Sequence, residues 1–383
     1  MASRSSPKGR SHFEELPAEL ILEVILHLRV ASIKQLSLVS STFRHICFPS
    51  IFRDVSFTSR RTPRRFLSTT RSWCAVPCVR KLSFDEIDSK AVKPHELLPW
   101  CTLVQELKMC LMADPTLYVP LLSGLGELRV FKLEHVIFQC SADLLEVFRS
   151  MSSTVKDLRI DDVQFASISY DEPIPTHTGK RIQVEKLSVG SSLVLELLLR
   201  DDSPVGFSHL EVAETRTIRS HLINKLCRLS PRLTKLVIGN PILEFNNEPL
   251  ELSTVKRLIL FFYYLEPGLT PLRDLLKPSN THLEELTIKL PVVFVTGESS
   301  EWESLALALS RRPRLKRVNV VLWEKWHRAY ADVNVRLNEL HRRLEPRRHM
   351  ISRILANNHF QVTVEGAHWF GDYSILSTMD SGN

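Results

Sequence analysis

Glycine is scarce in this chain, which has only twelve glycines in 383 residues. Enzymes that bind phosphate groups rely on glycine-rich turns, and the sequence has neither a P-loop nor a paired glycine motif. The G-x-S-x-G elbow of serine hydrolases and the H-E-x-x-H motif of zinc proteases are missing as well. These absences predict a protein that is not an enzyme, has no catalytic residues and needs no cofactor.

Long apolar runs are also missing. The longest, "LILFFYYL" and "LVLELLL", fall far short of the roughly 20 residues that cross a membrane. The first ten residues, MASRSSPKGR, are polar and basic, and no apolar segment of a secretory signal follows them. We therefore expect a protein that does not associate with membranes and works in the cytoplasm, the nucleus or both.

The seven cysteines are scattered and odd in number, which argues against a framework of disulfides. In the absence of a secretory signal, they are expected to be reduced. Cys74 and Cys78 form a close pair in "CAVPC", but their spacing is one residue too long for a C-x-x-C motif, and no second pair stands at zinc-binding spacing. We predict half-buried thiols here and no metal site.

The formal net charge is +7, which permits an acidic partner without requiring one. Basic clusters stand at 60–65, 311–317 and 341–349. None of them alternates with aromatic residues in the manner of a nucleic-acid platform, so nucleic acid is not an expected partner. We interpret the clusters as solvated surface, with nuclear localisation signals as the alternative.

The segment "LILEVILHL" (20–28) is too apolar for an ordinary surface helix. Its polar residues, Glu23 and His27, continue a stripe that starts at Glu19, and they leave the rest of the helix surface apolar. Pro17 suits the first position of a helix, and Glu19 suits the positive end of the helix dipole. A helix of this kind needs something to cover it.

A second helical pattern follows, in which Ile33, Leu36, Val39 and Phe43 recur at steps of three and four residues. Pro49 is predicted to end this helical stretch. Two or three short helices in about 35 residues are too few to form a core of their own. The segment must therefore pack against the rest of the chain, against a partner, or against both.

Residues 13–57 resemble an F-box. The family pattern is Leu-Pro, a glutamate two residues on, an apolar helix ending in Leu, a Leu…Val-Ser turn, an aromatic residue followed by Arg, and a closing Pro or aromatic residue. The matching residues here are Leu16, Pro17, Glu19, Leu20, Ile25, Leu28, Leu36, Val39, Ser40, Phe43, Arg44 and Pro49. Two positions depart from the pattern, because "ASIK" (31–34) replaces the usual acidic residue and Phe43 replaces the usual Trp.

The resemblance implies that this segment docks on a Skp-type adaptor and, through it, on the cullin scaffold of an SCF-type ubiquitin ligase. Helices of the adaptor would cover the apolar surface. The resemblance assigns adaptor binding to all of the matching residues except Ser40. The alternative is a helix that is buried in the core of this chain itself.

The remaining residues repeat a short strand-like pattern, apolar-x-x-apolar-x-apolar, as in "VRKLSF" and "LTKLVI". Its central residues stand 22 to 32 positions apart, and helical stretches such as "SHLINKLCRLSP" lie between them. Most of these spacings fall in the range of leucine-rich repeats. The predicted central residues are Leu82, Leu107, Phe131, Leu158, Leu187, Leu210, Leu236, Leu258, Leu286 and Val318.

This part resembles the degenerate leucine-rich repeats that often follow F-boxes, notably in fungal sequences. The resemblance implies an α/β fold: a short all-helical F-box, then an irregular solenoid with parallel strands on its concave face and helices on its convex face. A doubly wound α/β fold is the alternative, disfavoured by the lack of a glycine-rich phosphate turn. The predicted parts are a disordered tail (1–12), the F-box (13–57), the solenoid (58–370), which includes a basic helical insertion (324–358), and a second tail (371–383).

Alternation along each strand places the residues beside the central one on the outer face. Eight of these residues are basic and four are acidic, so an acidic or phosphorylated substrate would suit them. Scattered solvated charge is the alternative, with the substrate then bound by the loop at 170–180 or by the insertion. The predicted substrate-binding residues, expected to form a single row, are Lys81, Lys108, Lys132, Arg159, Lys186, Lys235 and Arg257.

Together these interpretations predict the substrate-recognition subunit of an SCF-type cullin–RING ubiquitin ligase, with an unidentified protein substrate. The second hypothesis is an F-box protein that works as a scaffold without supporting ubiquitination. A third hypothesis, of another class, is a repeat-type hydrolase or nucleic-acid binder whose N-terminus resembles an F-box by chance.

Overall fold

The computed structural model describes residues 16–58, 63, 65–68, 78–86, 93–167, 181–216, 219–239, 249–262, 269, 272–273, 276, 282–291, 299–326, 333–357 and 360–370. Several predictions fall outside these residues: both tails (1–12 and 371–383), the loop at 170–180, Cys74 and most of the basic cluster at 60–65.

The chain divides into two compact units. The first consists of Met1–Val155 and Asp162–Ile174, and the second of Lys156–Asp161 and Pro175–Asn383. Strand β5 (Asp157–Phe165) contributes residues to both units.

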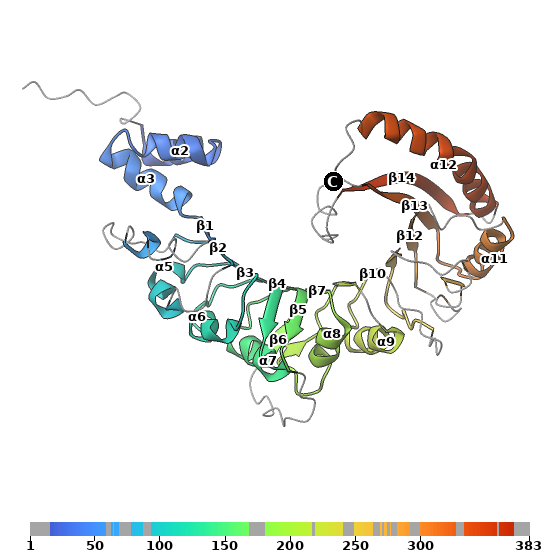
Figure 1. Cartoon of the computed structure of the whole chain (residues 1–383), viewed down its shortest axis with the longest axis horizontal. Helices are drawn as coiled ribbons and strands as arrows, with labels where there is room; N and C mark the ends of the chain where they lie inside the picture. The colour runs from blue at the N-terminus through green and yellow to red at the C-terminus, as the bar shows by residue number, and fades with distance from the viewer. Residues whose placement is uncertain are drawn as a thin grey trace, which may run out of the picture. The chain divides into compact units, whose positions relative to one another are not determined.

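Three helices open the first unit: α1 (Ala18–Leu26), α2 (Val30–Leu36) and α3 (Ser41–Ile51) (Figure 1). As predicted, α1 starts directly after Pro17 and carries Glu19 in its first turn. Only two residues of α1 are buried, so a single narrow side of this helix packs against its neighbours. The buried side chains of the three helices form one small core, made of Ile21, Ile25, Ile33, Phe43 and Cys47.

Pro49 lies inside α3, so the prediction that it ends the helical stretch is wrong. A proline inside a helix removes the backbone hydrogen bond that its N–H would have donated and crowds the carbonyl four residues earlier, but here it does not end the helix. The helix continues to Ile51, and the N–H of Phe52 donates to the carbonyl of Phe48 at 3.1 Å. At the other end, the Ser40 hydroxyl caps α3 by accepting from the N–H of Phe43 at 3.2 Å.

Parallel strands fill the rest of the first unit. Strands β1 (Asp54–Phe57), β2 (Lys81–Asp85), β3 (Glu106–Cys110) and β4 (Val130–Phe138) pair in chain order. The segment predicted as F-box, 13–57, therefore ends in a strand. The short helical elements of this unit are η3 (Pro94–Leu97), α5 (Leu98–Cys101), η4 (Pro115–Tyr118), α6 (Val119–Leu122) and the longer α7 (Ser141–Ser150).

The second unit is built in the same way. Its parallel strands pair in the order β5, β7 (Lys186–Val189), β9 (Val212–Thr215), β10 (Lys235–Gly239), β11 (Arg257–Phe261), β12 (Glu285–Pro291), β13 (Arg317–Trp326) and β14 (Gln361–Phe370). Two further short strands, β6 (Ile182–Gln183) and β8 (Val205–Gly206), form a separate pair.

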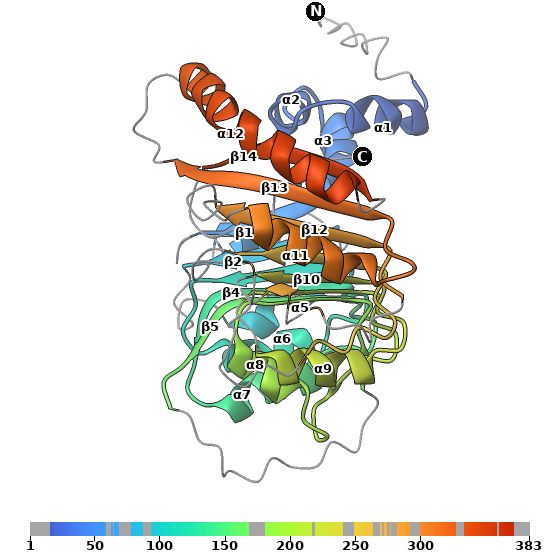
Figure 2. The same cartoon turned by 90° about the vertical axis from the view of Figure 1, so that its right-hand side faces the viewer.

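The helices of the second unit alternate with its strands along the chain. They include α8 (Ser192–Leu198), α9 (Ser220–Leu229), α11 (Ser299–Ser310) and α12 (Val333–Ala356). In Figure 2, α11 and α12 lie side by side over β12, β13 and β14. Helix α12 falls within the predicted insertion at 324–358, but the first residues of that segment extend β13 instead.

Burial alternates as predicted over the first residues of most strands, whereas in β7 and β10 every residue after the first is buried. Nine of the ten predicted central residues are the buried second residue of a strand. The exception is Leu210, because Ala213 occupies this place in β9 and lies opposite Leu187 and Leu236. Leu210 is buried three residues earlier, ahead of the strand. The apolar pattern favoured the larger Leu210, because the small and weakly hydrophobic Ala213 does not stand out in the sequence.

The described residues thus form a mixed α/β structure with N-terminal helices and parallel strands, in agreement with the predicted fold class. None of the helices in this part of the chain combines the length and the apolar character that crossing a lipid bilayer requires.

Candidate functional site

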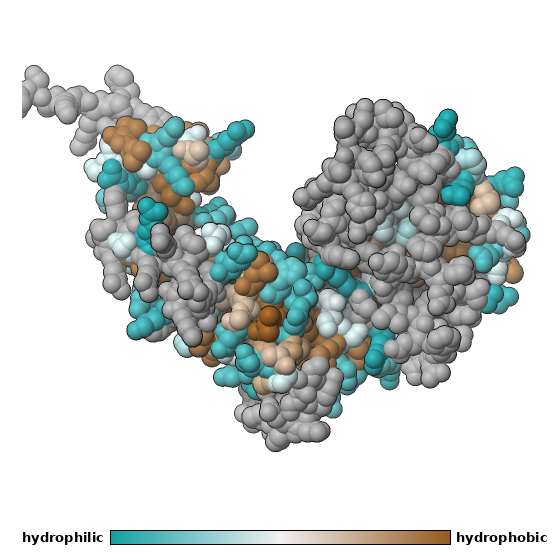
Figure 3. Space-filling view, viewed as in Figure 1, coloured by the Kyte–Doolittle hydropathy of each residue, from teal (hydrophilic) through white to brown (hydrophobic). Residues whose placement is uncertain are grey.

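Exposed apolar side chains gather on α1, at the start of α2 and in the segment between α2 and α3, where Figure 3 shows hydrophobic patches among hydrophilic residues. On α1 the most exposed apolar side chain is Leu26, at 64%, and in the segment between α2 and α3 Leu38 and Val39 are 74% and 65% exposed. Exposed apolar side chains gathered in this number on a protein surface mark an interaction site. We call this set the apolar helix surface: Leu16, Leu20, Leu22, Val24, Leu26, Leu28, Val30, Leu38 and Val39.

The surface exists because α1 has more apolar residues than its neighbours can cover. Ile21 and Ile25 are four residues apart and face the small core, while the residues between and beside them remain outside. The polar stripe is as predicted, with Glu23 and His27 3.6 Å apart and both largely exposed. The sides of this helix that face neither the small core nor the polar stripe present apolar side chains to solvent.

The predicted adaptor-binding residues fall into two groups. Ile25 and Phe43 are each 1% exposed and lie in the small core, so they hold the helices together beneath the surface. Leu36 and Arg44 are half-buried. The remaining seven are exposed: Leu16, Pro17, Glu19, Leu20, Leu28, Val39 and Pro49.

Five exposed apolar residues were not among the predicted ones. The sequence could have indicated them, because this segment has more apolar residues than a helix needs to contact a core through one narrow side. They are Leu22, Val24, Leu26, Val30 and Leu38.

A pocket of about 470 Å³ opens between α2 and α3. Its apolar lining includes Leu38, Phe48 and Phe52, and Lys34 and Arg44 also line it. The Nε of Arg44 donates to the carbonyl of Ser37 at 3.2 Å, which holds the guanidinium in place. An apolar side chain of a partner that enters this pocket would contact apolar side chains, with the positively charged groups of Lys34 and Arg44 beside it.

Aromatic rings connect the helices to the first strands of the same unit. Phe48 of α3 lies 4.4 Å from Phe52, measured between ring centroids, and Phe52 lies 5.9 Å from Phe66. The series continues from Phe66 to Phe57 of β1 at 5.5 Å, and from Phe57 to Phe84 of β2 at 5.5 Å. Only two residues separate the end of α3 from the start of β1. The helices are therefore packed onto the strands and do not hang from a flexible tether.

The segment that carries this surface matches a known domain family. A family model of the F-box domain matches residues 13–53, which contain α1, α2 and α3. The chain therefore carries an F-box domain, as predicted, and the domain indicates a role in binding a Skp-type adaptor of an SCF ubiquitin ligase.

The other comparisons add little. No curated protein matches the chain. A protein of Bacteroides fragilis with a solved structure is 12% identical over 82% of this chain and 74% of its own, with a TM-score of 0.31. A likeness this weak carries no argument about fold or function.

The predicted substrate-binding cations of the first unit are paired with carboxylates. Glu106 of β3 lies between two lysines, with Lys81 at 3.2 Å and Lys132 at 2.7 Å. Lys108 pairs with Glu134 at 2.5 Å. Burial would raise the pKa of Glu106, but hydrogen bonds and charge from Lys132 and Lys81 outweigh it and hold the pKa below its usual value.

In the second unit, two of the predicted cations are paired in the same way. The guanidinium of Arg159 donates two hydrogen bonds to Asp157, at 3.1 and 2.9 Å. Glu285 of β12 pairs with Arg257 at 2.9 Å and also with Arg317 on its other side. Glu285 thus repeats the arrangement of Glu106, with one carboxylate held between cations of two neighbouring strands.

The expectation of a single row is wrong. The register places Lys81 opposite Glu106 and Lys108 opposite Ser83, so Lys81 and Lys108 stand in different rows. A central apolar residue has two outward neighbours that are two residues apart on the strand, and the prediction merged them. The first positions hold Lys81, Lys186, Lys235 and Arg257, and the third positions hold Lys108, Lys132 and Arg159.

Because the sequence pattern centred this strand on Leu210 instead of Ala213, the prediction missed two further residues that face outward. Glu214 is the third residue of this strand, and Arg216 follows its end. Arg216 pairs with Asp161 at 2.7 Å. Burial raises the pKa of Glu214, while nearby cations, Arg216 first among them, oppose the rise. Reading β9 from Ala213 instead of Leu210 would have found both residues.

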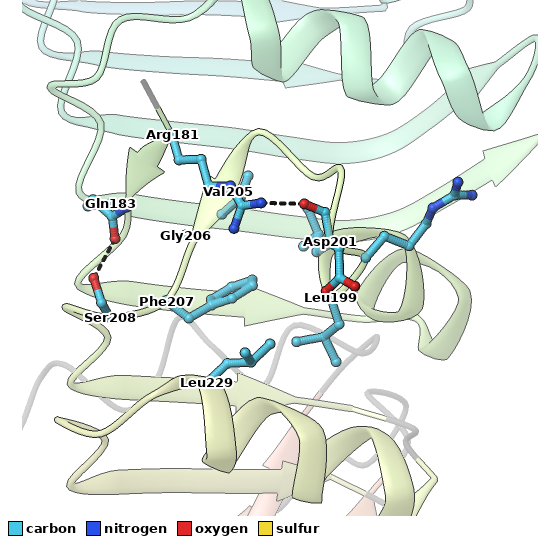
Figure 4. A pocket seen from close by; sticks show the side chains of 11 residues that line it. Arg181, Gln183, Leu199, Asp201, Val205, Gly206, Phe207, Ser208 and Leu229 are labelled. Atoms are coloured by element: carbon cyan, nitrogen blue, oxygen red, sulfur yellow. Dashed lines mark hydrogen bonds between the residues drawn. The ribbon is translucent and has the colours of Figure 1, made fainter. Parts of the chain in front are cut away.

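Other candidates for chemistry are few. Within the described ranges, no three His, Cys, Asp or Glu residues are grouped so that they could hold a metal ion. A pocket of about 180 Å³ lies beside β6 and β8 (Figure 4). There the Ser208 hydroxyl donates to Gln183 Oε1 at 2.7 Å, and Arg181 donates to the carbonyl of Asp201. Gly206 leaves room for the Gln183 amide, since a Cβ would lie 2.4 Å from its Nε2.

Proposed function

We propose that this protein is a substrate receptor of an SCF-type cullin–RING ubiquitin ligase. The F-box helices bind a Skp-type adaptor, the adaptor connects them to a cullin, and the repeats bind the substrate. In this proposal the chain performs no chemistry itself and requires no cofactor. The observation that supports it most strongly is the apolar helix surface on the segment that matches the F-box model.

The rest of the chain is proposed to be an irregular leucine-rich-repeat solenoid. Its support is the parallel pairing of successive strands within each unit, with a buried apolar residue at the second position of strands β2 to β5, β7 and β9 to β13. Helices such as α7, α8 and α9 separate the strands along the chain. A repeat of this type presents a broad face built from many strands, which suits the binding of another protein.

The catalytic contribution of such a receptor is proximity. A bound substrate is held near the ubiquitin-loaded enzyme, so that transfer to one of its lysines behaves as a reaction within a complex. The series of ring contacts from Phe48 and Phe52 through Phe66 to Phe57 of β1 fits this task, because a firm connection preserves that proximity.

A non-ligase F-box scaffold is the second candidate. It would use the same adaptor surface but present no ubiquitination target. The pairing of five of the seven predicted substrate-binding cations favours it, since paired charges hold strands together and contribute less to the capture of a substrate.

The test of adaptor binding uses two exposed residues of the apolar helix surface. The double variant Leu26→Asp and Leu38→Asp should weaken binding to a purified Skp-type adaptor by about a hundredfold or more, since buried apolar hot spots contribute about 2 kcal/mol each. The matched control is Leu307→Asp, because Leu307 is also 56% exposed but lies on α11. Equal adaptor affinity of the two variants would contradict the proposal.

The test of ligase activity follows from the first. Proximity labelling with the full chain should identify bound proteins, and reconstitution with adaptor, cullin and RING subunits should then ubiquitinate at least one of them. Binding of the adaptor without ubiquitination of any labelled protein would favour the scaffold.

A further inference from the structure

The pocket beside β6 and β8 has no part in the proposed binding of an adaptor or a substrate. Side chains from β6, from the segment after α8, from β8 and the residues that follow it, and from the end of α9 meet there (Figure 4). Its volume is about 180 Å³. Pockets for drug-sized ligands usually have about 300 to 1,000 Å³, so this pocket suits a smaller molecule.

One part of the pocket is apolar. Leu199 and Phe207 line it and are themselves only 1% and 5% exposed. Leu229, the last residue of α9, also lines the pocket but is 42% exposed. An apolar group of a ligand that packed against Leu229 would remove this exposed hydrocarbon from water, which favours binding.

A second part of the pocket offers hydrogen-bond donors. Arg181 donates to the carbonyl of Asp201, and the Ser208 hydroxyl donates to Gln183 Oε1 at 2.7 Å; dashed lines in Figure 4 mark both contacts. These contacts hold the two side chains in place and leave further N–H groups of the guanidinium, together with Gln183 Nε2, as donors. A carboxylate has two acceptor oxygens and therefore suits this pair of donors.

The pocket also contains an acceptor. The Asp201 carboxylate is exposed and forms no hydrogen bond or ion pair with the residues that the structure describes. Within the same residues, Arg181 pairs with no carboxylate. The second arginine of the pocket, Arg200, differs because it donates to both oxygens of Asp202, at 3.0 and 3.1 Å. One cation and one anion of this pocket thus remain available to a ligand.

A zwitterion complements these two charges. An α-amino acid carries a carboxylate, an ammonium group and a side chain on one carbon atom, so it can engage a cation, an anion and an apolar surface that lie close together. A phosphate ester would place its negative charge near the Asp201 carboxylate. An amine without a carboxylate would leave Arg181 without an anionic partner.

We propose that this pocket binds a free α-amino acid with an apolar side chain. The carboxylate of the ligand accepts from Arg181 and Gln183, its ammonium group donates to Asp201, and its side chain contacts the apolar part of the pocket. The inference goes beyond the proposed ligase function, because it gives the second unit a small-molecule ligand that adaptor binding does not require.

The experiment is isothermal titration calorimetry of the full chain with L-leucine and three analogues that each lack one group. L-leucinamide lacks the carboxylate, 4-methylpentanoate lacks the ammonium group, and glycine lacks the side chain. Each analogue should bind at least about tenfold more weakly than L-leucine, because each leaves one part of the pocket without its partner. No measurable binding of L-leucine, or equal affinity for L-leucine and L-leucinamide, would overturn the inference.

Two variants assign the charges. Arg181→Ala should weaken the binding of L-leucine by about tenfold or more but change the binding of L-leucinamide little, since that ligand has no carboxylate to lose contact. Asp201→Asn should weaken L-leucine in the same way and leave 4-methylpentanoate unchanged. A general disturbance of the fold would not produce these two opposite selectivities.

The matched control is Arg200→Ala, at an arginine that lines the same pocket but is already held by Asp202. This variant should bind L-leucine as the wild type does. A loss of affinity as large as that of Arg181→Ala would contradict the assignment of the carboxylate to Arg181. The comparison of ligands uses the wild-type chain, so it remains decisive even where a variant proves unstable to urea.

Discussion

His135 and Asp162 occupy equivalent places in strands β4 and β5 and are hydrogen-bonded, with His135 Nδ1 2.7 Å from Asp162 Oδ2. Each is the sixth residue of its strand, and each has a positive φ, 52° for His135 and 45° for Asp162. Glu86 and Leu111, which directly follow β2 and β3, share this conformation with φ values of 53° and 51°. The backbone of the first unit thus turns at the same point four times, each time without a glycine.

The first prediction concerns this turn. Leu111→Gly should raise the free energy of unfolding by about 1 kcal/mol, because glycine adopts a positive φ without the steric cost of a side chain. The side chain of Leu111 is 47% exposed, so its removal loses little burial. Urea denaturation measures the change. Leu117→Gly is the control, since Leu117 is similarly exposed at 44% but lies in η4 without a positive φ, and this variant should be less stable than the wild type.

The second prediction concerns the free chain. The apolar helix surface should make the protein associate at high concentration, and a bound Skp-type adaptor should prevent this by covering the surface. Light scattering is expected to show higher-order species for the chain alone and a single species for the complex. The variant Leu16→Ala with Pro17→Ala should no longer bind the adaptor and should remain associated when the adaptor is added. A clean monomer of the free wild-type chain would contradict this expectation.

The third prediction concerns Glu106. Glu106→Gln should lower the free energy of unfolding at pH 7 by about 1 kcal/mol, because Lys81 and Lys132 lose their shared carboxylate. The folded-state pKa of Glu106 lies below its unfolded value, so the stabilisation is present at neutral pH and is lost as pH falls below about 4. The difference between variant and wild type should shrink in that window. Glu127→Gln, at an exposed residue, is the control and should change the free energy of unfolding at pH 7 by less than Glu106→Gln does.

The fourth prediction has the opposite sign. Glu214 has a folded-state pKa above its unfolded value, so its ionisation at neutral pH opposes folding. Glu214→Gln should therefore raise the free energy of unfolding at pH 7 by about 1 kcal/mol, and the gain should vanish below about pH 4, where the carboxyl is protonated in both states. Denaturation at several pH values tests this. The exposed neighbour Glu211 supplies the control variant, Glu211→Gln, which should leave stability unchanged.

Local patterns in the sequence were enough to locate most elements. The crowded apolar residues at 20–28 indicated a docking helix, and the structure leaves Leu20, Leu22 and Leu26 exposed on it. Strand positions followed from apolar alternation wherever the central residue was large. Ala213 was missed because its burial depends on the neighbouring strands and not on its own hydrophobicity.

Charge was harder to interpret than hydrophobicity. The sequence correctly indicated that Lys81, Lys108 and Lys132 point away from the core. It did not indicate that Glu106 and Glu134 would engage them, because those contacts join residues about 25 positions apart. Only the register of the strands reveals which cations remain without a partner.

The two-residue connection between α3 and β1 makes the docking helices and the first strands move together as one rigid body. Because only Phe52 and Arg53 connect them, the docking helices cannot move far relative to the strands that follow. A rotation of the docked helices would carry β1 and β2 with it, because the rings of Phe48, Phe52 and Phe66 pack against one another in tilted and edge-to-face arrangements. Inserting a few glycines into this connection would let the helices and the strands move relative to each other, while each part keeps its own fold.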